Sequence, residues 1–455
     1  MNHPARQVGD DDTDDDCMST DDAAALLTRY RHVRDASLVH CASLQTEDFG
    51  LQAVPETSPA KWHLAHTAWF FETFLLRPFL QGYTEYNAGY AYLFNSYYNG
   101  VGAQFPRAER GLLSRPTVEE VIRYRAHVDH AMAQLLNQQD HRDIAVILSR
   151  TRLGLHHEYQ HQELLFTDLK YNFHCNPLLP AWQPATLPVS DTQTPQTWHR
   201  FAGGLSHLGV DEEPDQFCFD NETPRHQTLL QPFRLATRPL CNAEVLAFIE
   251  DGGYRNPALW LADGWARVQE GRWQHPLYWQ QDAHGAWHNF TLHGLQPLDP
   301  AATACHLSAY EADALARWAG ARLPTEAEWE HAANSQLAAR SPAASPALSG
   351  HFLDQGMRHP TAAAADTGPL QQLFGSVWEW TANSYSPYPG YRPAAGAIGE
   401  YNGKFMCNQL VLRGGSCVSA RQHIRPSYRN FFYPGDRWQF SGVRLARDDR
   451  PETAR

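Results

Sequence analysis

The spacing of apolar residues divides the chain into two parts. Over residues 20–175 the apolar positions recur with helical periodicity in four long segments, and the last of them begins near Arg142. Two of the segments open on a hydroxyl residue that can cap a helix N-terminus, Ser58 and Thr117. Thr117 is followed three positions later by Glu120, which is the spacing of a capping box. Four amphipathic helices of this length predict a four-helix bundle.

The second part of the chain has a different pattern. After residue 200, short aromatic and β-branched runs are broken by Gly, Pro, Asn and Asp, which is typical of a loop-rich fold with short strands. One amphipathic helix stands out there, at 308–324. The proline-rich segment 176–200 predicts a linker. The sequence therefore predicts an α+β multidomain protein, with a helical domain at 20–175 and a second domain at 201–455.

The net charge of the chain argues against some classes of function. The formal net charge is -13, which argues against nucleic-acid or anionic-membrane binding. Part of that charge lies in "DDDTDDD" at 10–16, so we expect residues 1–19 to be disordered. We find neither a leader-like N-terminus nor an apolar run of about 18 residues, and we expect a cytoplasmic protein. The eight scattered cysteines, without a CxxC pair, predict reduced thiols.

An unusual concentration of histidines lies in the fourth helical segment, "GLHHEYQHQELLFTDL". His157 and His161 are four residues apart, so they share one helix face. A third inward-facing imidazole is available on the second helix, where we select His66 because apolar residues at helical spacing share its face. We expect His63 to support this group or to lie at the surface, and His156 to be structural.

The histidine group has two interpretations. A pair at i and i+4 is often a surface feature or a satisfied core pair. A third histidine on a separate helix favours a metal, because each buried polar nitrogen left without a partner costs about 1–3 kcal/mol. Three neutral imidazoles leave coordination positions open, which suits a catalytic Fe(II) or Zn(II).

Two further groups follow the second helix. "YLFNSYYNGVG" places Tyr97 and Tyr98 in a loop, where adjacent tyrosines usually serve packing but a phenol near a metal can supply a proton. "FPRAERGLLSRP" then carries Arg107, Arg110 and Arg115, whose guanidinium groups suit a substrate carboxylate. Spacing alone does not choose among the three arginines.

Sequence motifs in both parts of the chain resemble those of a known family. "WHLAHTAWFFETFLL" and "HHEYQHQELLFTDLKYNF" are similar to the DinB-like domain of the EgtB-type sulfoxide synthases of ergothioneine biosynthesis. "DNETPRH", "RLPTEAEWEHAA", "GSVWEWTANSY" and "VLRGGSC" resemble the formylglycine-generating-enzyme fold, which is related to C-type lectins. The resemblance covers residues 20–447, and the pairing of the two domains is more specific than either one.

The resemblance implies a non-haem Fe(II) enzyme that uses O2 as a co-substrate to join a cysteine-type thiol to C2 of the hercynine imidazole, giving a sulfoxide. It implies that the three selected histidines bind the iron and that Gln160 lies near the hercynine imidazole. In some subgroups of the family the catalytic tyrosine lies in the second domain, whereas others carry a tyrosine pair in the "NSYYN" loop. By that likeness Tyr97 and Tyr98 are the expected proton or electron donors.

A substrate segment is implied at "YRNFFYPGDRWQF". Asn430 is expected to bind the hercynine carboxylate, and Phe431 and Phe432 to hold its trimethylammonium by cation–π attraction of about 0.5–2 kcal/mol. Arg107 and Arg110 are expected to bind the second carboxylate. Members that take γ-glutamylcysteine tend to have Trp-Asp after the Asn, so Phe-Phe favours free cysteine as the thiol.

Other functions must be considered, both because the chain departs from one of the family motifs and because related enzymes catalyse other reactions. Formylglycine-generating enzymes bind copper through two cysteines after "RGGS", whereas this chain has only Cys417 there, so oxidation of a sulfatase cysteine is not expected. An ovothiol-type 5-histidylcysteine sulfoxide synthase usually carries an extra methyltransferase domain. A zinc-dependent DinB-like thiol transferase would need no O2, and a lectin-like binding protein would leave the histidines unexplained. The sequence does not predict an oligomeric state.

Overall fold

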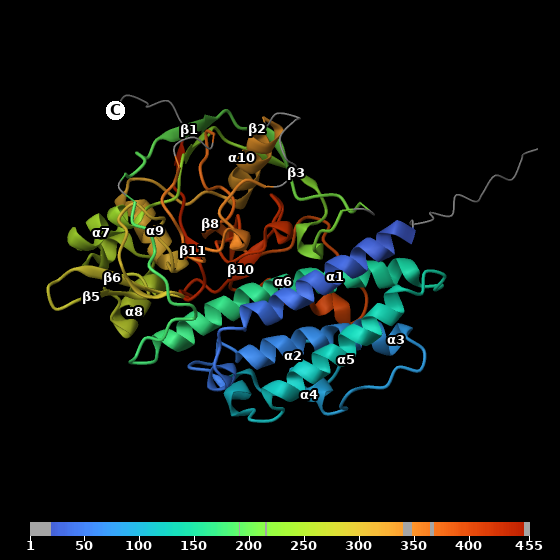
Figure 1. The fold of residues 1–455 in the computed structure, drawn as a ribbon. Helices are drawn as coiled ribbons and strands as arrows, with labels where there is room; N and C mark the ends of the chain where they lie inside the picture. The colour runs from blue at the N-terminus through green and yellow to red at the C-terminus, as the bar shows by residue number, and fades with distance from the viewer. Residues whose placement is uncertain (1–19, 191, 214–215, 340–347, 365–367, 450–455) are drawn as a thin grey trace, which may run out of the picture.

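The computed structural model describes residues 20–190, 192–213, 216–339, 348–364 and 368–449. The chain forms a helical bundle, drawn in blue to green in Figure 1, and a larger domain of mixed helices and strands above it, drawn in green to red. This arrangement confirms the predicted α+β multidomain class. The acidic segment 1–19 lies outside the described residues.

The four predicted helices form the bundle. They are α1 (Thr20–His40), α2 (Ala60–Phe71), α5 (Val118–Leu136) and α6 (Ile144–His174). The predicted capping box is present on α5, because the Thr117 side chain accepts from the Glu120 N–H at 3.2 Å and the Glu120 carboxylate accepts from the Thr117 N–H at 2.7 Å. On α2 the N-cap is Pro59 rather than Ser58, one residue later than the sequence suggests.

Short elements complete the bundle. Helix α2 runs through a π-helical turn (Glu72–Leu76) into α3 (Arg77–Phe79), α4 covers Tyr90–Phe94, and 3-10 turns lie at Thr46–Gly50 and Arg107–Leu112. The loop that carries the tyrosine pair lies between α4 and the second of these turns.

A buried ion network fixes the rotation of α6. Glu158 accepts hydrogen bonds from Arg34 at 2.7 Å, from Arg125 at 2.9 Å and from Ser37 at 2.6 Å. Burial alone would raise the pKa of Glu158, but the two guanidinium groups lower it to about 2. Glu158 therefore faces α1 and α5. His157, the preceding residue on α6, points in another direction and faces His66 on α2.

The described residues of the second domain form four small sheets. Their strand orders are β1-β4-β12, β10-β9-β8-β11, β2-β3 and β5-β6-β7. All described pairs are antiparallel except β8 with β11. The strands are β1 (Trp198–Phe201), β2 (Gly204–Leu208), β3 (His226–Leu230), β4 (Phe233–Ala236), β5 (Trp279–Gln281), β6 (Trp287–Thr291), β7 (Gly294–Pro297), β8 (Trp378–Ser384), β9 (Leu410–Arg413), β10 (Asn430–Phe432), β11 (Ser441–Gly442) and β12 (Ala446–Asp448).

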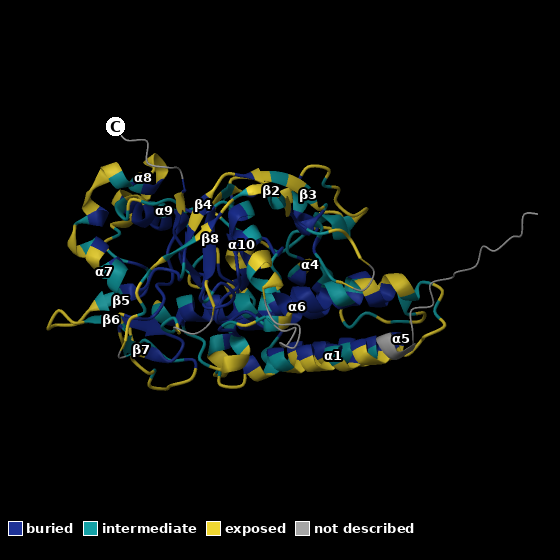
Figure 2. Ribbon diagram, turned by 90° about the horizontal axis from the view of Figure 1, so that it is seen from above, coloured by how far each residue is buried: buried dark blue, intermediate teal, exposed yellow. Residues whose placement is uncertain are grey.

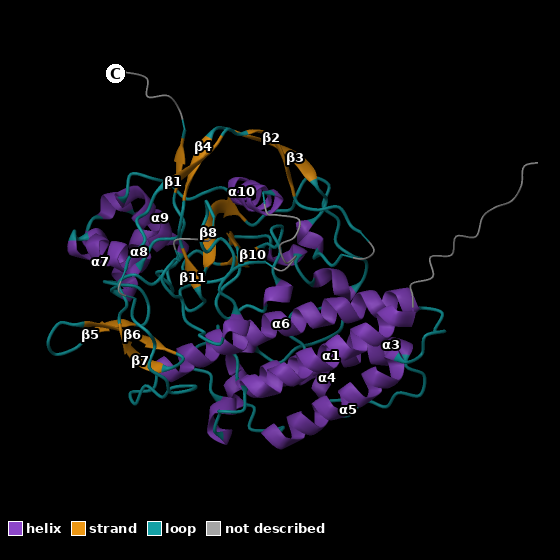
Figure 3. Ribbon diagram, turned by 45° about the horizontal axis from the view of Figure 1, so that its top comes forward, coloured by secondary structure: helices purple, strands orange, loops and turns teal. Residues whose placement is uncertain are grey.

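Helix α10 (Glu326–Ala338) packs against strands β2, β3, β8 and β9, whereas α7 (Asn242–Glu250), α8 (Ala262–Gly271) and α9 (Ala309–Trp318) lie together at one side of the domain (Figure 3). The predicted helix at 308–324 is present as α9, and α10 follows it with a Thr325–Glu328 capping box. The described residues of this domain also form 3-10 turns at Asp220–Glu222, Gly253–Arg255, Pro257–Leu259, Leu353–Gln355, Ala397–Glu400, Gly403–Phe405 and Arg421–His423.

The segment predicted as a linker, 176–200, lies along both domains. The Trp182 indole donates to the His40 carbonyl of α1 at 2.9 Å, and the Gln183 N–H donates to the Leu292 carbonyl at 3.2 Å. Strand β1 begins within this segment, at Trp198.

Helix α6 forms the seam between the domains, and its residues are largely buried (Figure 2). Glu163 on α6 accepts hydrogen bonds from Trp378 at 2.7 Å, from Ser416 at 2.7 Å and from Ser419 at 2.6 Å, all in the second domain. The segment 397–405, orange in Figure 1, reaches back to the bundle, where Glu400 accepts from the Gly100 N–H at 2.6 Å. None of the helices in the described part of the chain is both long and apolar enough to span a bilayer.

Candidate metal centre and substrate cavity

The three predicted histidines converge. One ligand atom from each of His66, His157 and His161 lies within 4.8 Å of the other two, and among the described residues this is the group of histidine, cysteine or acidic side chains close enough to hold a metal ion. Ring centroids are 4.9 Å apart for His66 and His157 and 4.6 Å apart for each of them with His161. Two helices, α2 and α6, therefore supply a three-imidazole centre, as the sequence predicts.

The Nε2 atoms of two of these rings face each other. The His66 Nδ1–H donates to the Phe94 carbonyl at 2.5 Å, which leaves the lone pair on Nε2. That Nε2 lies 3.2 Å from Nε2 of His157. The Nδ1 of His157 has no hydrogen-bond partner among the described residues. A cation between the rings accepts both lone pairs, whereas without one an imidazole must turn its N–H toward the other.

A relay of two further side chains orients the third ligand. Asp168 accepts from Nε2 of His63 at 2.9 Å and from the Ser58 N–H at 2.8 Å. His63 therefore presents a bare Nδ1, which lies 2.9 Å from Nδ1 of His161 and accepts its proton. This leaves Nε2 of His161 free as a metal ligand, so His63 is a supporting residue, one of the two roles that the sequence left open.

The ionisation of the three rings fits a metal. Burial lowers the pKa of His157 to about 3 and lowers the pKa of His66 and His161 well below the usual value. The rings are thus neutral near pH 7, which is the form that binds a cation. Three imidazoles suit Fe(II) or Zn(II) and leave further coordination positions for substrates.

The relay gives a first testable prediction. We expect His63→Ala to weaken metal binding about 10- to 100-fold, because losing a partner that orients a ligand typically has this effect. Competition with a chelator measures the change. His40→Ala, which removes another buried imidazole of the bundle, is the matched control. Equal metal affinity in His63→Ala and the unaltered protein would contradict the role of the relay.

A cavity of about 1030 Å³ opens beside this centre and is lined by both domains. His157 and His161 form part of its wall, and Asn430, Phe431 and Phe432 form another part. The metal centre and the predicted substrate segment therefore share one space, although 269 positions separate His161 from Asn430 along the chain.

The predicted tyrosine pair has one member at the cavity and one behind it. Tyr97 lines the cavity, whereas Tyr98 is fully buried against Trp69 and Phe74, with ring centroids at 5.5 and 5.0 Å. Their rings are stacked 4.6 Å apart, and their hydroxyl oxygens lie 3.5 Å apart. Burial raises the pKa of both phenols, so both keep their protons at neutral pH.

Gln160 lies between two tyrosines of the second domain that the sequence did not single out. Its Nε2 donates to the Tyr428 hydroxyl at 2.7 Å, and its Oε1 accepts from the Tyr401 hydroxyl. The Tyr401 ring lies 5.7 Å from the His157 ring. All three side chains line the cavity, so Gln160 is placed beside the metal centre.

The arginines differ in environment. Arg107 and Arg110 line the cavity, and Arg115 is not among the lining residues. Arg110 is buried, with its guanidinium carbon 3.4 Å from the centroid of Trp62, and it donates to Ser58 at 2.9 Å and to Ser96 at 3.1 Å. Among the described residues no carboxylate forms an ion pair with Arg110, so the cavity contains a cation available to an anionic ligand.

The substrate segment forms strand β10. Asn430 Oδ1 accepts from the Phe431 N–H at 2.9 Å, which leaves its amide N–H groups to donate. Phe431 stacks on Tyr385 with ring centroids 4.1 Å apart, and Phe432 lies 6.3 Å from Trp438. The two aromatic side chains are partly exposed, so their rings are available to a ligand.

A carboxylate that the sequence analysis missed lies in the same cavity. Asp436 accepts from the Tyr433 N–H at 3.1 Å and lines the cavity together with Arg107 and Arg267. Burial raises the pKa of Asp436 from 3.8 to about 7. No periodic pattern pointed to it, because it lies in the loop after β10.

The raised pKa of Asp436 predicts a pH-dependent stability. Between about pH 4 and pH 7 the unfolded chain has lost this proton and the folded chain keeps it, so the cost to stability grows as pH rises to 7 and is constant above. We expect Asp436→Asn to raise the melting temperature more at pH 8 than at pH 5, as measured by calorimetry. Asp263→Asn, an exposed carboxylate of the same cavity, is the control. An equal change at both pH values in Asp436→Asn would contradict the burial of its charge.

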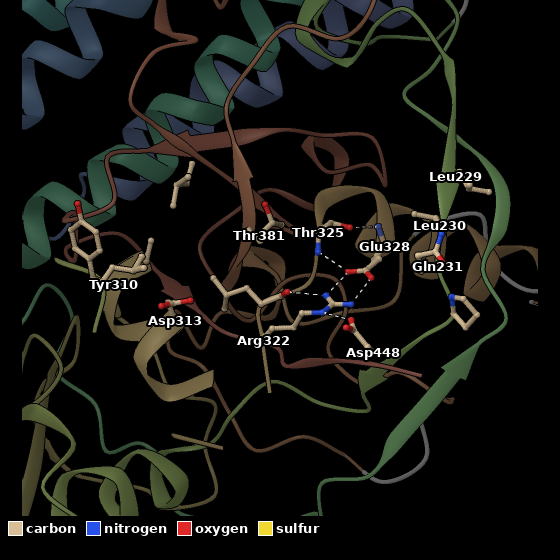
Figure 4. A pocket seen from close by; sticks show the side chains of 16 residues that line it. Leu229, Leu230, Gln231, Tyr310, Asp313, Arg322, Thr325, Glu328, Thr381 and Asp448 are labelled. Carbon is tan, nitrogen blue, oxygen red and sulfur yellow. Dashed lines mark hydrogen bonds and ion pairs between the residues drawn. The ribbon is translucent and has the colours of Figure 1, made fainter. Parts of the chain in front are cut away.

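A second cavity, of about 520 Å³, lies in the second domain (Figure 4). Its charged groups already have partners. Arg322 donates to both oxygens of Glu328 at 2.8 and 2.7 Å and to Asp448 at 2.8 Å, and Asp313 accepts from Arg317, which lies outside the lining, at 2.7 Å. This pairing satisfies the polar side of the cavity without a ligand, in contrast to Arg110 and the three histidines.

Comparison with known proteins follows the same division into two domains. Residues 29–165 match the DinB superfamily, and residues 184–449 match the sulfatase-modifying factor enzyme 1-like domain. The hercynine oxygenase of Mycolicibacterium thermoresistibile is 33% identical over 88% of this chain and 90% of its own length. That of Mycobacterium tuberculosis is 31% identical over 94% of this chain and 99% of its own length. The chain belongs to the hercynine oxygenase family.

Membership confirms the resemblance on which the sequence analysis relied. The second domain alone is also similar to a formylglycine-generating enzyme of Streptomyces coelicolor, at 31% identity over 48% of this chain and 77% of that protein. In this family member, Cys417 is fully buried and is a free thiol. The described cysteines are all free.

Proposed function

We propose that the protein is an Fe(II)- and O2-dependent sulfoxide synthase that joins cysteine to C2 of the hercynine imidazole. The main support for the proposal is that His66, His157 and His161 converge, and that two of them, His157 and His161, line a cavity that Asn430 also lines. Family membership supports the same reaction.

The protein supplies the iron site through the three Nε2 atoms described above. Iron bound there would supply the one-electron chemistry that O2 needs before it can react with paired-electron substrates. The hydrogen bonds from His66 to the Phe94 carbonyl and from His161 to His63 hold two of the rings in the metal-binding tautomer.

Hercynine would bind at β10. Its carboxylate would accept hydrogen bonds from the Asn430 amide, whose oxygen is already used by the Phe431 N–H. Its trimethylammonium would lie against the rings of Phe431 and Phe432. Gln160 would then meet the imidazole beside His161, so that the carbon to be attacked faces the metal centre.

Cysteine would bind at the arginines. Arg110 is buried and has no acidic partner among the described residues, so a substrate carboxylate would complete its environment. Arg107 lines the same cavity and would share this carboxylate. The thiol would thus be held near the three histidines and near the hercynine imidazole.

The tyrosine pair would deliver a proton. The reaction consumes the thiol S–H, the imidazole C2–H and O2, places one oxygen atom on sulfur and releases the other as water. Tyr97 lines the cavity and keeps its proton, so it can protonate oxygen during turnover. Tyr98, behind it, would replace that proton through the contact between the two hydroxyl groups, and a proton released by the substrates would return to the pair through Tyr97.

A specific observation favours γ-glutamylcysteine as a second candidate thiol. Asp436 lies in the same cavity as Arg107 and could accept a hydrogen bond from the α-ammonium group of a γ-glutamyl extension. The Phe-Phe sequence after Asn430 favours free cysteine instead, so Asp436 and the Phe-Phe pair favour different thiols.

One assay tests the proposal. Iron-loaded protein is incubated in air with hercynine and either cysteine or γ-glutamylcysteine, and the product mass and the position of the new C–S bond are determined. The proposal predicts a C2-linked sulfoxide with cysteine. A C5-linked product from histidine would support an ovothiol-type synthase, and turnover by the zinc protein without O2 would support a thiol transferase.

A further inference from the structure

A chain of hydrogen bonds leaves the cavity at Gln160 and crosses the domain seam. The Tyr428 hydroxyl, which accepts from Gln160 at 2.7 Å, lies 3.0 Å from Nε2 of His423. Nδ1 of His423 lies 2.9 Å from Nδ1 of His156 on α6. Tyr428, His423 and His156 are all buried. The roles proposed above do not use these three side chains.

The chain determines the tautomers of its members. Tyr428 already accepts from the Gln160 amide, so its own proton is available to Nε2 of His423. His423 then carries its proton on Nδ1 and donates it to Nδ1 of His156. Burial lowers the pKa of His423 well below the usual value, which keeps the ring neutral and allows it both to accept and to donate.

The same chain couples the orientation of the Gln160 side-chain amide to the proton positions of Tyr428, His423 and His156. If the amide were flipped, its oxygen would face Tyr428, and the phenol proton, the His423 proton and the His156 proton would all have to change places. At the other end, the Tyr401 hydroxyl donates to the Gln160 oxygen. Gln160 thus has one amide N–H and one oxygen lone pair left for a ligand in the cavity, and the chain relates the positions of this donor and this acceptor.

We propose that Tyr428 and His423 are positioning residues for the imidazole ring of the substrate, acting through the Gln160 amide. The inference rests on the proposed function, since it takes hercynine as the ligand. Neither residue is assigned contact with the reacting atoms. They hold the Gln160 amide, which would distinguish the protonated from the unprotonated nitrogen of the substrate imidazole. Packing supports this role, because the Tyr428 ring lies 4.8 Å from the His423 ring and 5.3 Å from Trp378.

The test compares two ligands that differ only in the ring. Hercynine and N,N,N-trimethylphenylalanine share the carboxylate and the trimethylammonium, but only hercynine has ring nitrogens. Both are titrated calorimetrically into the Fe(II)-loaded protein without O2. We expect Tyr428→Phe to weaken hercynine binding about fivefold, the effect of one net hydrogen bond, and to change binding of the phenylalanine analogue by less than about twofold.

His423 provides a rescue experiment. We expect His423→Leu to weaken hercynine binding as Tyr428→Phe does, and His423→Gln to restore it to within about twofold, because a glutamine amide can accept from Tyr428 and donate to His156. In aerobic turnover both damaging variants should raise KM for hercynine and leave KM for cysteine unchanged. Tyr388→Phe, which removes another buried hydroxyl of the second domain, should leave the affinity for both ligands unchanged.

The outcomes separate this inference from the proposed function. If Tyr428→Phe weakens both ligands equally, or neither, or if His423→Gln behaves as His423→Leu does, the positioning role is rejected while hercynine remains the substrate. If the unaltered protein fails to bind hercynine, the proposed substrate is rejected, and the inference with it.

Discussion

Replacing His157 by alanine is expected to leave the protein folded but without bound iron and without sulfoxide product. His157 supplies one of three ligand atoms that lie within 4.8 Å of one another, so the variant keeps only two of the three imidazole ligands. Even the loss of a partner that only orients a ligand weakens metal binding about 10- to 100-fold, so loss of the ligand itself should exceed that range. Metal analysis of the purified protein and O2 uptake measure the effect.

The control for this variant comes from the same helix. His174 lies at the end of α6, outside the cavity lining, so His174→Ala should keep one iron per chain and full turnover. Circular dichroism would confirm that both variants retain the bundle. Undiminished turnover by His157→Ala would remove the three-histidine centre from the account.

Replacing Tyr97 and Tyr98 together by phenylalanine is expected to divert the enzyme from sulfoxide formation to simple oxidation of the thiol to a sulfinate. Both phenols are protonated at neutral pH because burial raises their pKa. Without them the cavity loses the proton source assigned to the coupling reaction. A loss of about 10²–10⁴-fold in sulfoxide formation is the usual effect of removing a general acid. Mass spectrometry of both products gives the ratio of sulfoxide to sulfinate.

Single variants separate the two phenols. Tyr97 lines the cavity and Tyr98 does not, so Tyr97→Phe should have the larger effect. Tyr401→Phe is the comparison, because Tyr401 also lines the cavity and lies near His157. If the double variant makes sulfoxide at the normal rate while Tyr401→Phe does not, the proton donor belongs to the second domain.

The helical half of the protein could be predicted from the sequence because its signals are local. Apolar periodicity located α1, α2, α5 and α6, and the capping box at Thr117 located the start of α5. The spacing of His157 and His161 placed both on one face of α6. The apolar neighbours of His66 selected it over His63, and the hydrogen bonds agree, since His63 contacts His161 and Asp168 instead.

The second half offered weaker local signals. Helix α9 was predicted from its periodicity, whereas α10 was not, although Thr325 and Glu328 have capping-box spacing. Its strands are short, and they pair across long stretches of sequence, as β1 and β12 do with β4. Propensity alone cannot assign such pairs.

The parts of the candidate site that sequence reasoning missed are those made by distant segments. Tyr401 and Tyr428 meet Gln160 across more than 240 positions of the chain. Asp436 lies in a loop without periodicity. Their positions depend on how the second domain packs on α6, so no local pattern in the sequence indicates them. The family resemblance indicated Gln160 but not Tyr401 and Tyr428, the two side chains that hold it.

Anomalous diffraction at the iron absorption edge, from crystals grown without O2 in the presence of Fe(II) and hercynine, would show whether three histidines of two helices hold one iron ion in the cavity shared with the second domain. We expect one strong iron peak about 2.1 Å from Nε2 of His66, His157 and His161, as expected for imidazole–metal bonds, with the hercynine imidazole beside Gln160. An iron peak elsewhere in the protein, or hercynine bound away from Asn430, would rule out this site.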